Sequence, residues 1–194
     1  ELLLDVLPPE FIGYCDKQEG TALHRAHFRE RGDIAKMIAA KLPDDRFAPP
    51  EHEGLSILHN ASAFADEELM ATLVSKVPHD HLMYRSFTQA TPLHCAAHFG
   101  NIAAINVILD AAPEAAALQD DDGNTALHIA VIKSQADAAE LLLQRLPTED
   151  VALPNGKGKT AAALASRKKS LAHLFSGAAV PAAPASRRTR RSRR

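Results

Sequence analysis

The sequence contains no tryptophan, and only 5% of its residues are aromatic. Few aromatic residues are expected in a protein whose thin helical layers pack against each other through alanine and leucine. Its two cysteines, Cys15 and Cys95, stand far apart, which indicates reduced thiols in an intracellular protein, cytoplasmic or nuclear. No apolar run approaches the ~20 residues that span a bilayer, and no charged start followed by an apolar segment marks a signal peptide.

A four-residue slot returns along the chain at steps of 35, 35, 34 and 35 residues. Its copies are Thr21-Ala22-Leu23-His24, Ser56-Ile57-Leu58-His59, Thr91-Pro92-Leu93-His94, Thr125-Ala126-Leu127-His128 and the degenerate Thr160-Ala161-Ala162-Ala163. Self-similarity at a fixed period of this size indicates an array of stacked repeats. Each unit is then too small to bury its apolar face alone and must stack on its neighbours.

Three more positions recur in register with the slot. An alanine stands two residues after its fourth position, at Ala26, Ala61, Ala96, Ala130 and Ala165. A large aliphatic residue stands seventeen residues after each slot begins, at Ile38, Leu73, Ile108 and Leu142, and a proline follows at Pro43, Pro78, Pro113 and Pro147. Alanine lets two helices lie close together, and proline cannot continue a helix. Each copy is therefore predicted to be a helix, a short turn, a second helix and a proline-terminated loop.

The slot Thr91-Pro92-Leu93-His94 followed by Ala96, and the tip sequence from Asp120 to Thr125, resemble the ankyrin repeat. The resemblance covers nearly all of residues 1–177. It implies an all-α solenoid of stacked helix pairs joined by short β-hairpin or turn loops, in which the slot histidine bonds the backbone of a neighbouring hairpin. The period exceeds the family's ~33 residues, so a longer loop is expected after the second helix.

Some turn positions depart from the family pattern. Gln89 stands where the third repeat should have its tip glycine, and Gly20 is shifted in the first. The glycine between the helices is kept at Gly100 but replaced by Ala65 and Ser134 in the second and fourth repeats. These changes are expected to alter local turns and not the fold.

Residues 1–20 match the second half of a repeat, because Glu1 to Leu4 precede Pro8 as Glu140 to Leu143 precede Pro147, at an offset of 139. We therefore expect a C-terminal piece of a longer protein; a processed start with a short capping helix is the alternative. The predicted units are 1–20 (second helix and loop of a preceding repeat), 21–55, 56–90, 91–124 and 125–159 (four repeats), 160–177 (a degenerate capping repeat), 178–186 (an Ala/Pro linker) and 187–194 (a basic tail).

Three features imitate catalytic, metal or nucleotide sites. His94 and His98 have the spacing of a zinc-protease helix, but Cys95 stands where the catalytic glutamate is needed. Gly158-Lys159-Thr160 resembles the end of a phosphate-binding loop, yet Leu153 takes the place of its first glycine. Neighbouring residues on a helix point about 100° apart, so His94 cannot serve Cys95 as a base. We predict no catalytic, cofactor or metal site, and no enzyme.

The last eight residues carry six arginines: Arg187, Arg188, Arg190, Arg191, Arg193 and Arg194. The formal net charge of the whole chain is −2, so the other 186 residues carry a net charge of −8. This tail is predicted to be a signal for an import receptor or a secretion machine, or a contact for a polyanion. A solubilising terminus without a specific reader is the alternative. Proteins that read bases usually interleave aromatic residues, which this tail lacks.

In the ankyrin family the concave surface of hairpin tips and first helices binds other proteins. The corresponding variable positions here are Arg25, Phe28, Arg29, His52, Asn60, Phe64, Phe87, Cys95, His98, Phe99, Asp121, Ile129, Ile132 and Lys133. Phe28, Phe64, Phe99 and Ile132 are predicted to form an apolar stripe, and aromatic residues and arginine are enriched at binding hot spots. The alternative is that some of these phenylalanines fill space between helix layers.

The sequence thus favours a monomeric, non-catalytic module that binds a partner protein in its concave groove. A second hypothesis makes it the targeting domain of a larger enzyme or of a host-directed effector. A third hypothesis assigns the main function to the arginine tail, which would serve nuclear import or nucleic-acid contact.

Overall fold

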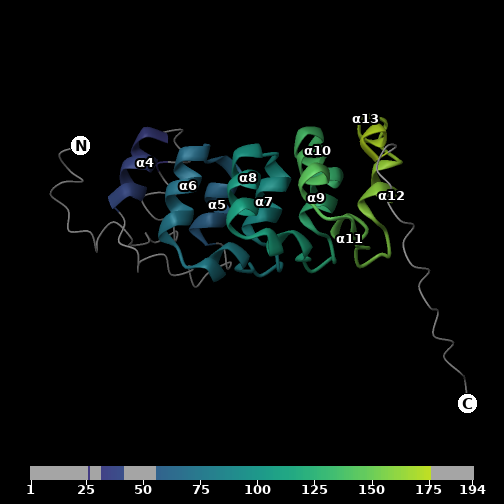
Figure 1. Ribbon diagram of the computed structural model, residues 1–194, viewed down its shortest axis with the longest axis horizontal. Helices are drawn as coiled ribbons and strands as arrows, with labels where there is room; N and C mark the ends of the chain where they lie inside the picture. The colour runs from purple at the N-terminus through teal and green to yellow at the C-terminus, as the bar shows by residue number, and fades with distance from the viewer. Residues whose placement is uncertain (1–25, 27–31, 42–55, 176–194) are drawn as a thin grey trace, which may run out of the picture.

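The computed structural model describes Ala26 and residues 32–41 and 56–175. The predictions for residues 1–20, for Arg25, Phe28, Arg29 and His52, and for the linker and tail lie outside these residues. Helix pairs stand side by side along the long axis of the molecule, in the order of the chain (Figure 1). The predicted stacked array is confirmed, whereas the exact residues that divide its units stay a prediction.

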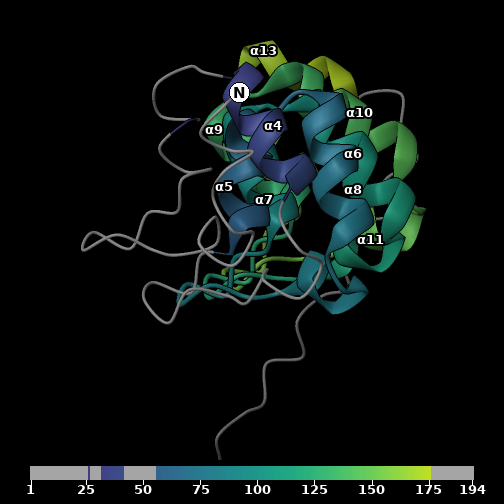
Figure 2. The ribbon, with the colours of Figure 1, turned by 90° about the vertical axis from the view of Figure 1, so that its left-hand side faces the viewer.

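Two layers of helices make up the array, as the end-on view shows (Figure 2). The first helices of the repeats are α5 (Ile57–Phe64), α7 (Pro92–Phe99), α9 (Ala126–Lys133) and α12 (Ala161–Ala165). The second helices are α4 (Gly32–Lys41), α6 (Glu67–Lys76), α8 (Ile102–Ala111), α10 (Ala136–Arg145) and α13 (Lys169–Ala172), which η3 (His173–Phe175) continues. First helices pack on first helices and second helices on second helices of the neighbouring repeats.

One apolar core runs through the array, and the recurring residues form it. The slot leucines Leu58, Leu93 and Leu127 are buried, as are the alanines Ala61, Ala96, Ala130 and Ala165. The aliphatic residues of the second helices, Leu73, Ile108 and Leu142, are fully buried beside them. Because methyl side chains occupy the contacts between first helices, the helices approach closely, and burial of the larger residues stabilises the stack.

The prolines after the second helices do more than end them. The sequence predicted a loop there, and the structure places a short helix in the three such loops that it describes: η1 (His79–Met83), η2 (Pro113–Ala117) and α11 (Thr148–Val151). Pro78 and Pro147 directly precede their helices, and Pro113 is the first residue of η2. Proline is preorganised for a helix start, where its missing N–H costs nothing.

Three turn loops, which we call the tips (residues 86–90, 120–124 and 155–159), lead into α7, α9 and α12. In the second tip, Asp120 N–H donates to Asn124 O at 2.9 Å and Gly123 N–H donates to Asp120 O at 2.9 Å. The other tips have the same pair of bonds, and neighbouring tips are joined through Asp121 N–H to Thr88 O (3.1 Å) and Gly156 N–H to Asp122 O (2.8 Å). No strand occurs in the described part of the chain, so the tips are turns rather than hairpins with strand arms.

Left-handed backbone occurs where the pattern calls for glycine, even where another residue is present. In the tips, φ is 56° at Gln89, 74° at Gly123 and 69° at Gly158. After the first helices, Ser134 at 64° follows Gly100 at 73°. Ala65 differs, because its backbone is extended at φ −64° and ψ 144°. Gln89 and Ser134 therefore keep the left-handed turn at a cost in backbone strain, whereas Ala65 changes the turn.

The slot histidines join each first helix to the next tip. In His94, Nδ1 lies 3.1 Å from Thr91 N and 2.8 Å from Thr91 Oγ1, and Nε2 lies 2.9 Å from Asn124 O. His59 reaches Ala90 O and His128 reaches Lys159 O in the same way, at 2.9 and 3.0 Å. A carbonyl only accepts, so Nε2 carries the proton and Nδ1 accepts from the threonine or serine. We call these three residues the histidine ladder.

Burial lowers the pKa of every member of the histidine ladder, and it brings that of His59 to about 4. Each ring is therefore neutral in the folded chain near neutral pH. An unfolded histidine takes up a proton near pH 6.5. The unfolded state consequently binds more protons than the folded state below that pH, and stability must fall as the solution becomes acidic.

Replacing Gln89 with glycine should stabilise the fold. A side chain at positive φ costs about 1 kcal/mol that glycine does not incur. We expect Gln89→Gly to raise the free energy of unfolding by about 0.5–1 kcal/mol in urea denaturation. The mirror variant Gly123→Gln should lower it by more, because a Cβ there would clash with the backbone nitrogen of Gly156. Equal stability of both variants and the parent would contradict this.

Acid should destabilise the array through the histidine ladder. Between pH 6.5 and the lowered pKa values, each histidine should remove about 1.4 kcal/mol of unfolding free energy per pH unit. Urea denaturation at a series of pH values measures this slope. His59→Gln should remove the share that His59 contributes, up to about 1.4 kcal/mol per pH unit, whereas Asn60→Gln, on the same helix, should keep the slope unchanged. An unchanged slope in His59→Gln would show that the ring is not buried in its neutral form.

Candidate protein-binding surface

The exposed large apolar side chains of the described residues gather on one side of the array. Phe64, Phe99 and Ile132 are 48%, 49% and 40% exposed and stand at the ends of α5, α7 and α9. Phe87, 68% exposed, lies in the first tip. The tips project on the side of the first helices (Figure 2). These residues therefore share the face that first helices and tips make together, which we call the groove face.

Phe64 and Phe99 contact each other across two repeats. Their ring centroids are 5.0 Å apart and their planes are tilted by 45°. Each is the last residue of its helix, and α5 packs directly on α7, so the two positions fall side by side. The His98 ring lies beside that of Phe99, with centroids 4.7 Å apart. Both phenylalanines stay about half exposed and are not buried between the helix layers.

Side chains from the following repeat hold the ends of the first helices. Asn101 Nδ2 donates to Ala65 O at 2.9 Å, and Gln135 Nε2 donates to His98 O at 3.0 Å. Lys168 Nζ donates to Ile132 O at 2.6 Å. Carbonyls at a helix end lack partners within the helix, so these bonds satisfy them and fix the spacing of the helix ends. Asn101 and Gln135 both stand ten residues after a slot begins, a recurrence that could have shown this role from sequence.

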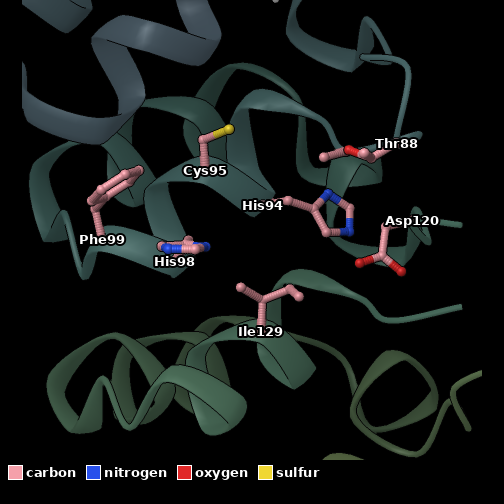
Figure 3. A pocket seen from close by; sticks show the side chains of 8 residues that line it. Thr88, His94, Cys95, His98, Phe99, Asp120 and Ile129 are labelled. Atoms are coloured by element: carbon pink, nitrogen blue, oxygen red, sulfur yellow. The ribbon is translucent and has the colours of Figure 1, made fainter. Parts of the chain in front are cut away.

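A cavity of about 190 Å³ opens between α7 and α9. Its lining residues are Thr88, Ala90, His94, Cys95, His98, Phe99, Asp120 and Ile129. Figure 3 shows Asp120 and Thr88 at one end, Phe99 and His98 at the other, and Ile129 across from Cys95. The structure thus brings together four of the predicted residues: Cys95, His98, Phe99 and Ile129.

The two ends of the cavity differ in charge. The Asp120 carboxylate is held in place by Asp122 N–H at 3.0 Å and Asn124 N–H at 2.7 Å. At the other end, partial burial and then the charge of Lys133 lower the pKa of His98. The neutral His98 ring therefore lies near the exposed Lys133 ammonium, and the fixed Asp120 carboxylate lies at the opposite end of the cavity.

Neither His94 nor Cys95 is arranged for catalysis. Both nitrogens of His94 are engaged, one by Thr91 and one by Asn124. Burial raises the pKa of the Cys95 thiol to about 11, so it is not a nucleophile near neutral pH. In the described part of the chain, no three His, Cys, Asp or Glu side chains gather closely enough to hold a metal ion.

The other predicted residues are separate from the cavity or outside the described chain. Asp121 is exposed in the second tip, Lys133 is exposed at the end of α9, and Asn60 is partly buried on α5. Gly158 and Lys159, which imitate a phosphate loop, belong to the third tip. Among the helices that the structure describes, none combines the length and apolar character that a membrane crossing requires.

Cys95 should react slowly with alkylating agents. With a thiol pKa of about 11, its thiolate fraction at pH 7.5 is about two orders of magnitude below that of a free cysteine. We expect iodoacetamide to label Cys95 at a correspondingly lower rate, measured by mass spectrometry of the peptide that contains it. Unfolding in urea is the control and should restore the ordinary rate. Equal rates in the folded and unfolded chain would contradict the burial of the thiol.

Comparison with known proteins agrees with this architecture. A model of three copies of the ankyrin repeat matches residues 58–155, which is half of the chain. A search of the curated proteins finds no match. The matched segment runs from the first turn of α5 to the loop after α11 and contains the histidine ladder and the cavity. The chain belongs to the ankyrin-repeat family, whose members generally mediate protein–protein interaction and are typically non-catalytic.

Proposed function

We propose that this chain is a protein-binding module that docks a partner protein on the groove face and has no chemistry of its own. One observation carries the proposal: all the large apolar side chains that are exposed in the described residues lie on first helices or tips, at Phe64, Phe87, Phe99 and Ile132. Soluble proteins scatter single exposed apolar residues, whereas a gathering on one face is typical of an interaction site.

The opposite face supports the same assignment. Exposed positions of α10 carry Asp137, Glu140 and Gln144, and Arg145 donates to Asn106 and Asp110 of α8. Such a surface of charged and paired side chains is well hydrated and offers no apolar anchor. The contrast between the two faces favours docking on the groove face.

The groove face is also preorganised. The histidine ladder fixes each tip to the preceding first helix, and Asn101 and Gln135 fix the helix ends. A surface held in this way loses little conformational entropy when a partner binds. Aromatic anchors on a rigid support are the kind of residues that dominate binding energy.

Paired substitutions test the proposal. Affinity capture from a lysate of cells that express the protein should recover a partner with the parent chain. The variant Phe64→Ala/Phe99→Ala should retain about tenfold less of it, because both anchors are removed while the helices keep their cores. The matched control Glu140→Ala/Gln144→Ala, on α10, should capture as much as the parent.

Thermal denaturation should show that all three proteins are folded. If the parent and Phe64→Ala/Phe99→Ala capture the same partners equally well, the groove face is not the binding surface.

A further inference from the structure

The cavity between α7 and α9 is sized for one side chain. Its volume of about 190 Å³ is smaller than the 300–1,000 Å³ of pockets that bind drug-sized molecules. It opens on the same face as the exposed Phe99 ring, which also lines it. A protruding residue of a docked protein could therefore enter it without any rearrangement of the helices.

The cavity walls select an apolar side chain. Ile129 and Phe99 supply hydrocarbon, and the Cys95 thiol is neutral because its pKa is about 11. His94 contributes a ring whose two nitrogens are already bonded within the repeat, so it has no polar group left to offer. A polar side chain placed between these walls, away from Asp120 and His98 at the two ends, would lose its hydrogen bonds to water without replacement.

The tip end of the cavity is acidic. Asp120 lines it, and Asp121 and Asp122 follow in the same tip with exposed side chains. The charge of Asp120 reaches into the cavity wall, since it opposes the burial that lowers the pKa of His94 and of His128. Arg85 stands before the first tip, where its guanidinium donates to Gln119 O at 2.8 Å. Lys157 and Lys159 stand in the third tip, which contributes no residue to the cavity lining. Among the residues that line the cavity, Asp120 alone carries a full charge, so this end of the cavity is negative.

The helix end of the cavity is basic. Lys133 is exposed at the end of α9 and acts on His98. Lys168 reaches the same helix end, where Nζ lies 2.6 Å from Ile132 O and 2.7 Å from Ser134 Oγ. The two ammonium groups and the carboxylates of the tip thus stand at opposite ends of one apolar cavity.

Building on the function proposed above, we propose that the partner segment presents one apolar side chain to this cavity, flanked by a basic residue toward Asp121 and Asp122 and an acidic residue toward Lys133. Charge complementarity of this kind fixes the direction in which a segment lies and rejects the reverse order. The occupant is therefore a short peptide segment with the order basic, apolar, acidic from tips to helix ends.

Selection from a library of random twelve-residue peptides displayed on phage tests this inference with the whole chain as bait. Enriched peptides should contain an apolar residue with Lys or Arg on one side and Asp or Glu on the other. The enriched peptide is then synthesised, with a second version in which the two charges are exchanged. Binding of both is measured by fluorescence anisotropy at low salt.

Charge-reversal variants give the decisive comparison. Lys133→Glu and Asp121→Lys/Asp122→Lys should each bind the enriched peptide about tenfold more weakly, and the variant with all three changes should prefer the charge-exchanged peptide. Glu140→Lys, on the opposite face, is the matched control and should bind like the parent. Asp120 is left unchanged because its carboxylate holds the tip.

The outcomes separate this inference from the proposed function. Peptides that lose binding in Phe64→Ala/Phe99→Ala but bind the charge-reversal variants as they bind the parent would overturn the inference alone. Peptides that bind all of these variants equally would overturn the inference and the proposed function together. A selection that enriches no peptide with both charges around an apolar residue also overturns the inference.

Discussion

A buried imidazole joins each first helix to the next tip, and the shape of the groove face depends on it. In His94, Nε2–H donates a hydrogen bond to Asn124 O, and Nδ1 accepts hydrogen bonds from the hydroxyl and the N–H of Thr91. A second proton, on Nδ1, would displace the hydrogen bond from the Thr91 N–H, which can only donate. The ring must therefore stay neutral, and burial favours that state.

The same contact connects fold and function. Tips held by His59, His94 and His128 keep a constant position relative to α5, α7 and α9, so side chains on tips and on helices form one surface. The residues that differ between repeats then give this surface its chemistry. Phe64 and Phe99 pair on it, while Asp120 and Lys133 set opposite charges at the ends of the cavity.

Periodicity predicted the array because each recurring residue makes a contact that repeats with the unit. Alanine at the helix contacts, leucine in the slot and histidine at the start of the first helix repeat with the unit. The helix after Pro78 could not be predicted, since a proline-terminated loop and a proline-started turn of helix have the same pattern. Gln89 and Ser134 show that the array imposes left-handed backbone on residues that do not prefer it.

The cavity could not be predicted from the sequence, for a different reason. Its lining comes from α7, α9 and two tips, and only stacking brings these together. Nitrogen-15 correlation spectra of the histidine rings test the central claim most directly. At pH 7, His59, His94 and His128 should be protonated at Nε2 and unprotonated at Nδ1. Doubly protonated rings, or rings that exchange between tautomers at that pH, would contradict it.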